Sequence, residues 1–221
     1  MRGLIFDVDG VLGDSEGLSE RASVRVFKER YGIDVNGEDF RAFIGTGPHR
    51  YMQGVAEKYG VDIDVEEAID LRQEFYVELL AGGVDIGFPG THALIEAARQ
   101  SPDWKLAIAT SSPRNKATAT LHAARVDTDW FDVLIYGDMV THKKPDPEIY
   151  LTAMAALGLS ADDCVVIEDA ITGIQAAKAA GCACLAVTNS FGGHELAQAD
   201  RVVDSLEGIT LADLGELLIG E

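Results

Sequence analysis

The residues of this chain most suited to chemistry are two acidic side chains close to its N-terminus. Asp7 and Asp9 stand two positions apart and directly follow the apolar segment 3–6. A short apolar segment closed by a glycine, here Gly10, is typical of a buried strand that ends in a tight loop. Carboxylates at such a strand end require a cation or several hydrogen-bond donors, because an uncompensated charge beside an apolar core is costly. The pair therefore indicates a candidate cation site, although a solvated acidic turn remains open from this pair alone.

A calcium loop of the EF-hand type also begins with alternating acids, but the sequence excludes it. That loop requires glycine at its sixth position and a bidentate glutamate at its twelfth. Counted from Asp7, these positions hold Leu12 and Leu18. Other parts of the chain must therefore complete any cation site.

Three later segments also carry polar side chains where apolar runs end or a lysine meets proline. Residues 106–109 lead into Thr110-Ser111-Ser112, and residues 165–167 lead into Glu168-Asp169. Lys144 lies between these two segments, in the run Lys143-Lys144-Pro145-Asp146-Pro147. Ligands of parallel α/β sheets bind beyond the carboxyl ends of the strands. These polar residues are therefore predicted to converge with Asp7 at one edge of a sheet.

The elements that must position these residues alternate between strand and helix. Apolar runs typical of strands cover residues 3–6, 104–109, 132–136, 163–167, 182–187 and 201–203, with helical patterns between them. This alternation predicts a doubly wound parallel sheet of the α/β class. Between the first two strands, however, residues 15–86 hold only helical patterns, at 20–31, 51–59 and 65–80. That stretch is too long for one crossover helix, so it predicts an inserted helical subdomain.

The four motifs, in this order and each at its expected place, resemble those of the haloacid dehalogenase superfamily of phosphohydrolases, specifically its β-phosphoglucomutase-like branch. The resemblance runs from Leu4 to the last expected helix. It implies a core domain of residues 1–14 and 87–221 and an α-helical cap domain of residues 15–86. The linkers 13–15 and 87–90 are then expected to act as a hinge, since both join the cap to the core.

The resemblance also implies phosphoryl transfer in which the two acids of the first motif have different roles. Asp7 is expected to attack phosphorus and form an aspartyl-phosphate, which requires its carboxylate to be ionised. Asp9 is expected to act as general acid and base: it protonates the leaving alkoxide and then activates water. An aspartate at this second position favours phosphate esters, because the dehalogenases and phosphonatases of the family carry another residue there.

The same resemblance implies a Mg²⁺ ion, for which Mn²⁺ could substitute, because the implied ligands are hard oxygens. The expected ligands are the carboxylates of Asp7 and Asp169 and the backbone carbonyl of Asp9. Glu168 is expected to bind the ion directly or through a water. The metal site is thus predicted to combine residues of the first and last motifs.

The phosphoryl oxygens are expected to be held by Lys144, Thr110 and Ser111. Lys144 is expected to neutralise charge on Asp7 and on the phosphoryl group, and Thr110 to donate a hydrogen bond. Lys143 competes with Lys144 for this role, but the run from Lys144 to Tyr150 matches the family pattern with Lys144 in the functional place. A functional lysine before a proline also leads to the hypothesis that the Lys144–Pro145 bond is cis.

Two activities share these core motifs, and the cap residues distinguish them. The stretch around Gly45 resembles the cap of sugar-phosphate mutases, with Arg50 or His49 as the basic residue that follows. The lysine that these mutases carry in the last long cap helix is replaced by Glu78, whose charge repels a second phosphate. A phosphatase is therefore favoured and a mutase is the alternative. A catalytically inactive binding module is a remote alternative, because every motif residue is present.

Composition restricts the partners of the chain. With 18 basic and 37 acidic residues, its formal net charge is −19. Such a surface repels nucleic acid and anionic membranes, so we expect neither as a partner. It also repels a phosphorylated substrate at long range, which makes a divalent cation at the site more plausible. We expect a small phosphorylated metabolite as substrate and a monomer as the default state.

Other features favour a cytoplasmic protein. No apolar run approaches the length of a membrane span, and a strand expected from residue 3 leaves no room for a signal or transit peptide. Cys164, Cys182 and Cys184 are odd in number, and two of them lie in apolar surroundings. They are expected to be buried, reduced thiols and not a disulfide framework.

Overall fold

The computed structural model describes residues 1–43 and 48–219. The chain folds into two compact units. The first, the core unit, consists of Met1–Asp14 and Asp85–Glu221, and the second, the helical unit, consists of Ser15–Val84. Gly45, which was predicted to contact substrate, lies outside the described residues.

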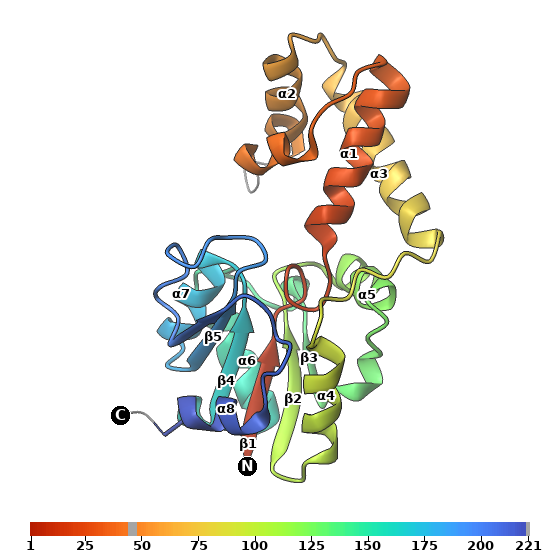
Figure 1. Cartoon of the computed structure of the whole chain (residues 1–221). Helices are drawn as coiled ribbons and strands as arrows, with labels where there is room; N and C mark the ends of the chain where they lie inside the picture. The colour runs from red at the N-terminus through yellow and green to blue at the C-terminus, as the bar shows by residue number, and fades with distance from the viewer. Residues whose placement is uncertain (44–47, 220–221) are drawn as a thin grey trace. The chain divides into compact units, whose positions relative to one another are not determined.

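The core unit is built on a parallel sheet of six strands (Figure 1). All five pairings between neighbouring strands are parallel, and the order in space is β3-β2-β1-β4-β5-β6. This order confirms the predicted doubly wound sheet. The strands are β1 (Arg2–Phe6), β2 (Trp104–Ala109), β3 (Val133–Ile135), β4 (Cys164–Glu168), β5 (Ala183–Val187) and β6 (Arg201–Val203).

Helices cover both faces of this sheet, which explains why the central strands β1 and β4 are apolar except for Arg2 at the start of one and Glu168 at the end of the other. Helices α4 (Thr91–Gln100) and α8 (Leu211–Leu217) contact each other, as do α6 (Glu148–Leu157) and α7 (Ile171–Ala179) (Figure 1). Helix α5 (Arg114–Ala123) follows β2. The short 3-10 turns of the core unit are Thr128–Trp130, Gly137–Met139 and Ala161–Asp163.

The chain order creates a switch point beside the first strand. From β1 the chain continues outward to β2 and β3, and it then returns through α6 to β4 on the other side of β1. Phe6 therefore pairs with Ile108 of β2 and with Ile167 of β4. In open α/β sheets this is the place where connections diverge and leave a crevice for ligands.

The helical unit contains α1 (Ser15–Tyr31), the 3-10 segment Gly37–Phe43, α2 (Pro48–Tyr59) and α3 (Val65–Ala81). Helices α1 and α2 both pack against α3. An aromatic cluster forms its interior: the ring of Phe40 lies 5.9 Å from that of Phe27 and 4.9 Å from that of Tyr51. Aromatic side chains supply large buried areas, so a unit of this size has an apolar core of its own.

The two segments that connect the units pair with each other within the core unit. Gly13 and Gly87 form an antiparallel bridge, and the Asp14 amide donates to the Ile86 carbonyl at 2.8 Å. The second segment is also tied to α5, because the Ile86 amide donates to the carbonyl of Ala123 at 3.3 Å. The points at which the chain leaves and re-enters the core unit are therefore held side by side.

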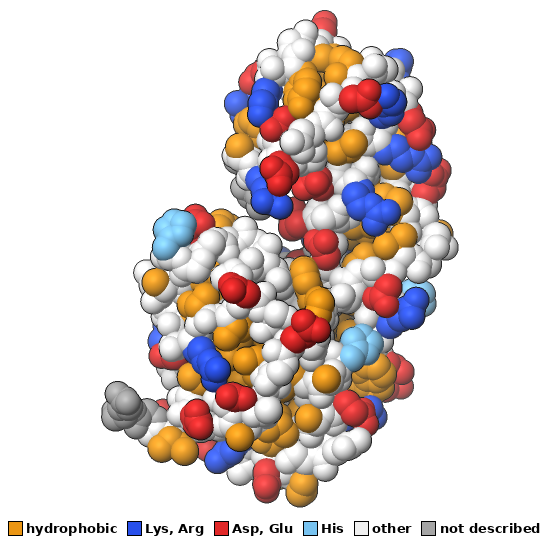
Figure 2. All heavy atoms as spheres, in the orientation of Figure 1, with side chains coloured by type: hydrophobic (Ala, Val, Ile, Leu, Met, Phe, Trp, Pro, Cys, Tyr) orange, Lys and Arg blue, Asp and Glu red, His pale blue; other side chains and the backbone are white. Residues whose placement is uncertain are grey.

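Acidic side chains are spread over the face shown in Figure 2, in line with the net charge of −19. None of the described helices combines the length and the apolar character that crossing a membrane requires. Cys164, Cys182 and Cys184 are buried and free, as predicted. Burial raises the pKa of Cys164 to about 11 and that of Cys182 to about 12, so both thiols stay protonated near neutral pH.

Two glycines of the core unit, Gly90 and Gly158, have a left-handed backbone conformation but differ in how closely other atoms pack around them. Gly90 has a φ of 83°, and a Cβ there would lie 2.2 Å from the backbone carbonyl carbon of Leu206. Gly158 has a similar φ of 69°, yet a Cβ there meets nothing within 4 Å. Gly158→Ala is expected to lower the free energy of unfolding by about 1 kcal/mol, the cost of the conformation, and Gly90→Ala by about 3 kcal/mol, since backbone must also shift. Urea denaturation followed by circular dichroism measures both, and equal losses would contradict the packing difference.

Candidate active site

Asp7 lies next to the switch point of the sheet, immediately after β1. The register of β1 on β4 continues for one further bond, in which the Asp7 amide donates to the carbonyl oxygen of Ile167 at 3.1 Å. This register places Asp7 beside Glu168, the last residue of β4. Asp7 is only 8% exposed. The sheet thus holds a carboxylate in a fixed place with little access to solvent.

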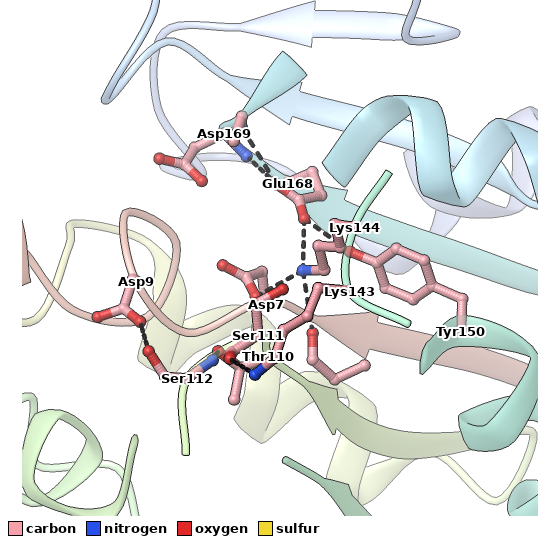
Figure 3. Close-up of polar contacts among 12 residues, drawn as sticks. Asp7, Asp9, Thr110, Ser111, Ser112, Lys143, Lys144, Tyr150, Glu168 and Asp169 are labelled. Atoms are coloured by element: carbon pink, nitrogen blue, oxygen red, sulfur yellow. Dashed lines mark hydrogen bonds and ion pairs between the residues drawn. The ribbon is translucent and has the colours of Figure 1, made fainter. Parts of the chain in front are cut away.

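The Lys144 ammonium joins the ends of three strands (Figure 3). Its Nζ atom donates to Asp7 Oδ1 at 2.7 Å, to Glu168 Oε1 at 2.7 Å and to the carbonyl oxygen of Ala109 at 3.2 Å. An ammonium has three N–H donors, so the protein uses all of them. Burial alone lowers the pKa of Lys144, but the charges of Asp7 and Glu168 outweigh it and raise the pKa. Lys144, and not Lys143, is the lysine that contacts Asp7.

The loop that carries Lys144 is shaped by Glu148 at the start of α6. The Glu148 carboxylate accepts hydrogen bonds from the amides of Thr141 and His142, both at 2.8 Å. His142, Asp146 and Glu148 lie close enough to one another to form an acidic cluster, but they are bonded within this loop. The Lys144–Pro145 peptide bond is cis, as hypothesised. The bonds of Glu148 hold the loop that carries Lys144.

Glu168 is held by four donors. Its Oε1 accepts from Lys144 Nζ and from the Tyr150 hydroxyl, both at 2.7 Å. Its Oε2 accepts from the amides of Asp169 at 2.9 Å and Ala170 at 3.1 Å. A carboxylate offers about four acceptor positions, so these donors fill them. Direct binding of a cation by Glu168 requires one of these bonds to break, which makes Asp7 and Asp169 better placed as direct ligands.

Asp169 follows β4 and is 3% exposed. Its Oδ2 accepts a hydrogen bond from the Ser190 hydroxyl. The same oxygen lies against Gly10, where a Cβ would come within 1.8 Å of it. Gly10 has a φ of 81°, so both its conformation and this contact require glycine. Ligand atoms of Asp169, Asp7 and Glu168 all lie within 4.8 Å of one another.

Asp9 belongs to a separate polar group beside the loop after β2 (Figure 3). Its Oδ2 accepts from the Ser112 hydroxyl at 2.5 Å, and its Oδ1 lies 3.2 Å from Lys116 Nζ. The Asp9 side chain is 21% exposed, compared with 11% for Asp7. This carboxylate can therefore exchange protons with a bound molecule or water more easily than Asp7 can.

Thr110 directly follows β2 and is 1% exposed. Its Oγ1 accepts from the Ser112 amide at 3.2 Å, and this bond does not use the hydroxyl hydrogen. The Ser111 carbonyl accepts from Lys143 Nζ at 3.0 Å. Lys143 therefore anchors the loop after β2. Phosphate binding by Ser111 stays a prediction.

Negative charge exceeds positive charge in the buried group around Asp7. Three carboxylates face one ammonium. Burial raises the pKa of Asp7 from 3.8 to about 7, Lys144 opposes this shift, and Glu168 and Asp9 add to it. Burial also raises the pKa of Asp169, with repulsion from Glu168 in the same direction. One divalent cation balances the excess charge, and oxygen ligands of this kind suit Mg²⁺. The residues present therefore fit the implied ion.

The remaining predicted residues lie in the helical unit. Arg50 Nη1 pairs with Glu57 Oε2 at 2.7 Å, and its guanidinium lies 5.1 Å from the ring centre of Phe43. Substrate contacts by Arg50 and Gly45 stay predictions. Glu78 Oε2 pairs with Arg25 Nη1 at 2.6 Å. Because Arg25 compensates this charge, Glu78 repels a second phosphate less strongly than the sequence predicts.

Four side chains that contact the candidate residues are not predicted from the sequence: Tyr150, Ser112, Lys116 and Ser190. Tyr150 and Ser112 lie within the motifs 144–150 and 110–112, so the sequence places both of them near the site. Lys116 lies in the first turn of α5, close in sequence to Ser112. No local pattern distinguishes Ser190 from an ordinary loop serine.

Comparisons with known proteins agree on one family. A family model described as haloacid dehalogenase-like hydrolase matches residues 1–181. Protein SUPPRESSOR OF QUENCHING 1, chloroplastic, of Arabidopsis thaliana is 38% identical over 96% of this chain, which spans 20% of that protein's length. The phosphorylated carbohydrates phosphatase of Thermotoga maritima is 36% identical over 82% of each chain. A solved putative beta-phosphoglucomutase from Thermotoga maritima has a TM-score of 0.81 and 32% identity, over 98% of this chain and 99% of the other.

The bond from Tyr150 to Glu168 is expected to matter for stability. Tyr150→Phe removes a donor from a carboxylate that stays buried, so the free energy of unfolding is expected to fall by about 1–3 kcal/mol. The ring beneath Lys144 is retained. Tyr31→Phe is the matched control, because the Tyr31 hydroxyl bonds the Asp64 carbonyl at an exposed position, and its effect is expected to stay under about 0.5 kcal/mol. Urea denaturation compares the two variants, and equal effects would contradict the role of Tyr150.

The raised pKa of Asp7 predicts that Mg²⁺ stabilises the protein more at high pH than at low pH. Between pH 3.8 and about 7 the folded protein keeps a proton on Asp7 that the unfolded chain has lost, so this group lowers metal-free stability as pH rises. Mg²⁺ must displace that proton at about pH 5 but not at about pH 8. The rise in melting temperature from EDTA to Mg²⁺ is therefore expected to be larger at about pH 8. Differential scanning calorimetry measures it, and an equal rise at both values would count against the site.

Proposed function

The chain belongs to the haloacid dehalogenase-like hydrolases, and we propose that it is a Mg²⁺-dependent phosphatase that hydrolyses a small phosphomonoester through an aspartyl-phosphate on Asp7. One observation carries the proposal: the ammonium of Lys144 contacts the buried carboxylate of Asp7. Asp7 is 8% exposed, and Lys144 Nζ lies 2.7 Å from its Oδ1. Such a carboxylate keeps one orientation, and the adjacent charge reduces its repulsion of an incoming phosphoryl group.

In the proposed transfer step, a carboxylate oxygen of Asp7 forms a bond to phosphorus while the bond from phosphorus to the ester oxygen breaks. Lys144, whose three donors bond the protein, stabilises the charge on the phosphoryl oxygens through its own positive charge, and the Thr110 hydroxyl donates a hydrogen bond to one of these oxygens. Bound Mg²⁺, held by the carboxylates of Asp7 and Asp169 and the backbone carbonyl of Asp9, supplies the remaining positive charge. The site thus compensates locally for a chain whose net charge is −19.

Asp9 is proposed to carry the proton. It protonates the leaving alkoxide, and it then takes a proton from the water that attacks the aspartyl-phosphate, which restores the Asp7 carboxylate. Its partial exposure and its bonds to Ser112 and Lys116 support this role, because they hold the carboxylate near the site without burying it. Asp7 and Asp9 therefore divide the reaction between a shielded nucleophile and an accessible acid and base.

The proposed substrate is a phosphorylated sugar. A relative from Thermotoga maritima that is named a phosphorylated carbohydrates phosphatase supports this class. A mutase is the alternative, since it forms the same aspartyl-phosphate and differs in using a sugar hydroxyl instead of water as the acceptor. The solved relative named a putative beta-phosphoglucomutase supports keeping this alternative in the test. The cytoplasmic location and the monomeric state stay predictions.

Phosphorus NMR identifies the acceptor directly. The protein is incubated with Mg²⁺ and a mixture of phosphomonoesters that includes β-glucose 1-phosphate. Growth of the inorganic phosphate signal is expected, and the ester that disappears identifies the substrate class. Conversion of β-glucose 1-phosphate to glucose 6-phosphate with little inorganic phosphate would overturn the phosphatase and establish a mutase.

Two variants and a control connect this activity to the first motif. Asp7→Asn is expected to abolish phosphate release, and Asp9→Asn to lower kcat by about 10²–10⁴-fold, the usual worth of a positioned acid or base. Asp103→Asn, at an exposed acid in the turn before β2, is expected to behave as the wild type. Activity that persists in Asp7→Asn would exclude Asp7 as the nucleophile.

A further inference from the structure

The loop that follows β5 contacts both parts of the chain that are proposed to bind the cation. Ser190 donates its hydroxyl hydrogen to Asp169 Oδ2. Its neighbour Asn189 donates from Nδ2 to the carbonyl oxygen of Gly10 at 2.7 Å. Asp169 follows β4, and Gly10 lies in the loop after β1. Two adjacent residues therefore bond a carboxylate from one strand end and the backbone from another.

Asp169 depends on this loop for its orientation. The next residue in the chain, Ala170, has no side-chain donor, and Asp169 itself is 3% exposed. Over residues 1–43 and 48–219, Ser190 is the one side chain that donates a hydrogen bond to Asp169. Asp169 Oδ2 is thus confined between the Ser190 hydroxyl and Gly10. Its Oδ1 is the oxygen on which a cation can bind without displacing that hydrogen bond.

A hydroxyl is chemically suited to this position. A charged donor, such as the ammonium that bonds Asp7, also lowers the cost of a buried carboxylate, but it repels a cation bound to the same group. A hydroxyl donates one hydrogen bond and carries no net charge. It therefore fixes the carboxylate with much less opposition to the ion. Hydrogen-bond partners of this kind raise metal affinity because the ligand is oriented before the metal binds.

We propose that Ser190 is a positioning residue for the cation, which holds the Asp169 carboxylate in its metal-binding orientation. Asn189 assists because its bond to the Gly10 carbonyl holds the loop of Asp9 and Gly10 next to Asp169. The inference rests on the proposed function, in which Asp169 is a ligand of Mg²⁺. It implies that the loop after β5 contributes to the affinity for the ion without taking part in the transfer step.

Calorimetric titration of the whole chain of residues 1–221 with Mg²⁺ tests the proposal without any substrate. Ser190→Ala is expected to raise the Mg²⁺ dissociation constant about 10-fold, as for other residues that orient metal ligands. The Mg²⁺ concentration that gives half-maximal phosphate release is expected to rise in parallel with the dissociation constant. Ser190→Thr keeps the hydroxyl and is expected to restore the wild-type dissociation constant.

Thr188→Val is the matched control. It removes a hydroxyl from the same loop, but that hydroxyl bonds Asp204 Oδ1 at 3.0 Å, away from the acids of the site. Its Mg²⁺ dissociation constant is expected to equal that of the wild type. An unchanged constant in Ser190→Ala, or an equal loss in Thr188→Val, would overturn the positioning role.

Asp169→Asn separates this inference from the proposed function. If Asp169→Asn binds Mg²⁺ as tightly as the wild type, Asp169 is not a ligand and the proposed metal site is wrong. If Asp169→Asn binds weakly while Ser190→Ala binds normally, the metal site stands and only the role of Ser190 is overturned. Weak binding by both variants, with rescue by Ser190→Thr, supports the proposal.

Discussion

One buried ammonium holds together the edge of the sheet at which the candidate residues of the core unit lie. Lys144 Nζ bonds groups at the ends of β1, β2 and β4, and its charge offsets carboxylates that a parallel sheet brings to one edge. Breaking a buried ion pair leaves an uncompensated charge, which typically costs about 3–5 kcal/mol. The loop bonded to Glu148 and the hydroxyl of Tyr150 both support this contact. The sheet places the carboxylates close together, and the charge of Lys144 reduces the repulsion between them.

Lys144 compensates only part of the buried negative charge, and the remaining negative charge favours binding of a cation. The buried acids retain more negative charge than Lys144 supplies, so burial and repulsion act against the folded metal-free state. A protein selected for stability alone has no reason to keep such a group, whereas a site that must hold a cation beside a phosphoryl group does. Long-range repulsion from the rest of the chain fades over about 10 Å at ordinary ionic strength, so local charges at the strand ends dominate binding.

The strands and the polar residues at their ends could be predicted because both follow from local pattern. Apolar runs gave the strand positions to within about one residue. Asp7, Glu168 and Asp169 converge because parallel strands end together, and Lys144 contacts them from the loop before α6. The bonds of Tyr150 and Ser190 could not be predicted, since their partners lie 18 and 21 positions away with no spacing rule to connect them. Arg25, which compensates Glu78, is 53 positions from it. Local sequence thus identifies the candidate residues, and tertiary contacts determine how each one is held.

The paired segments at Gly13 and Gly87 make the helical unit an exchangeable module. The bridge between them and the bond from Asp14 to Ile86 pin the two ends of the insertion to the core unit itself. An insertion whose ends are already adjacent can change length at little thermodynamic cost, about 0.6 kcal/mol for each doubling of a flexible loop. Residues 15–84 can therefore change in length or content without moving the paired segments at Gly13 and Gly87.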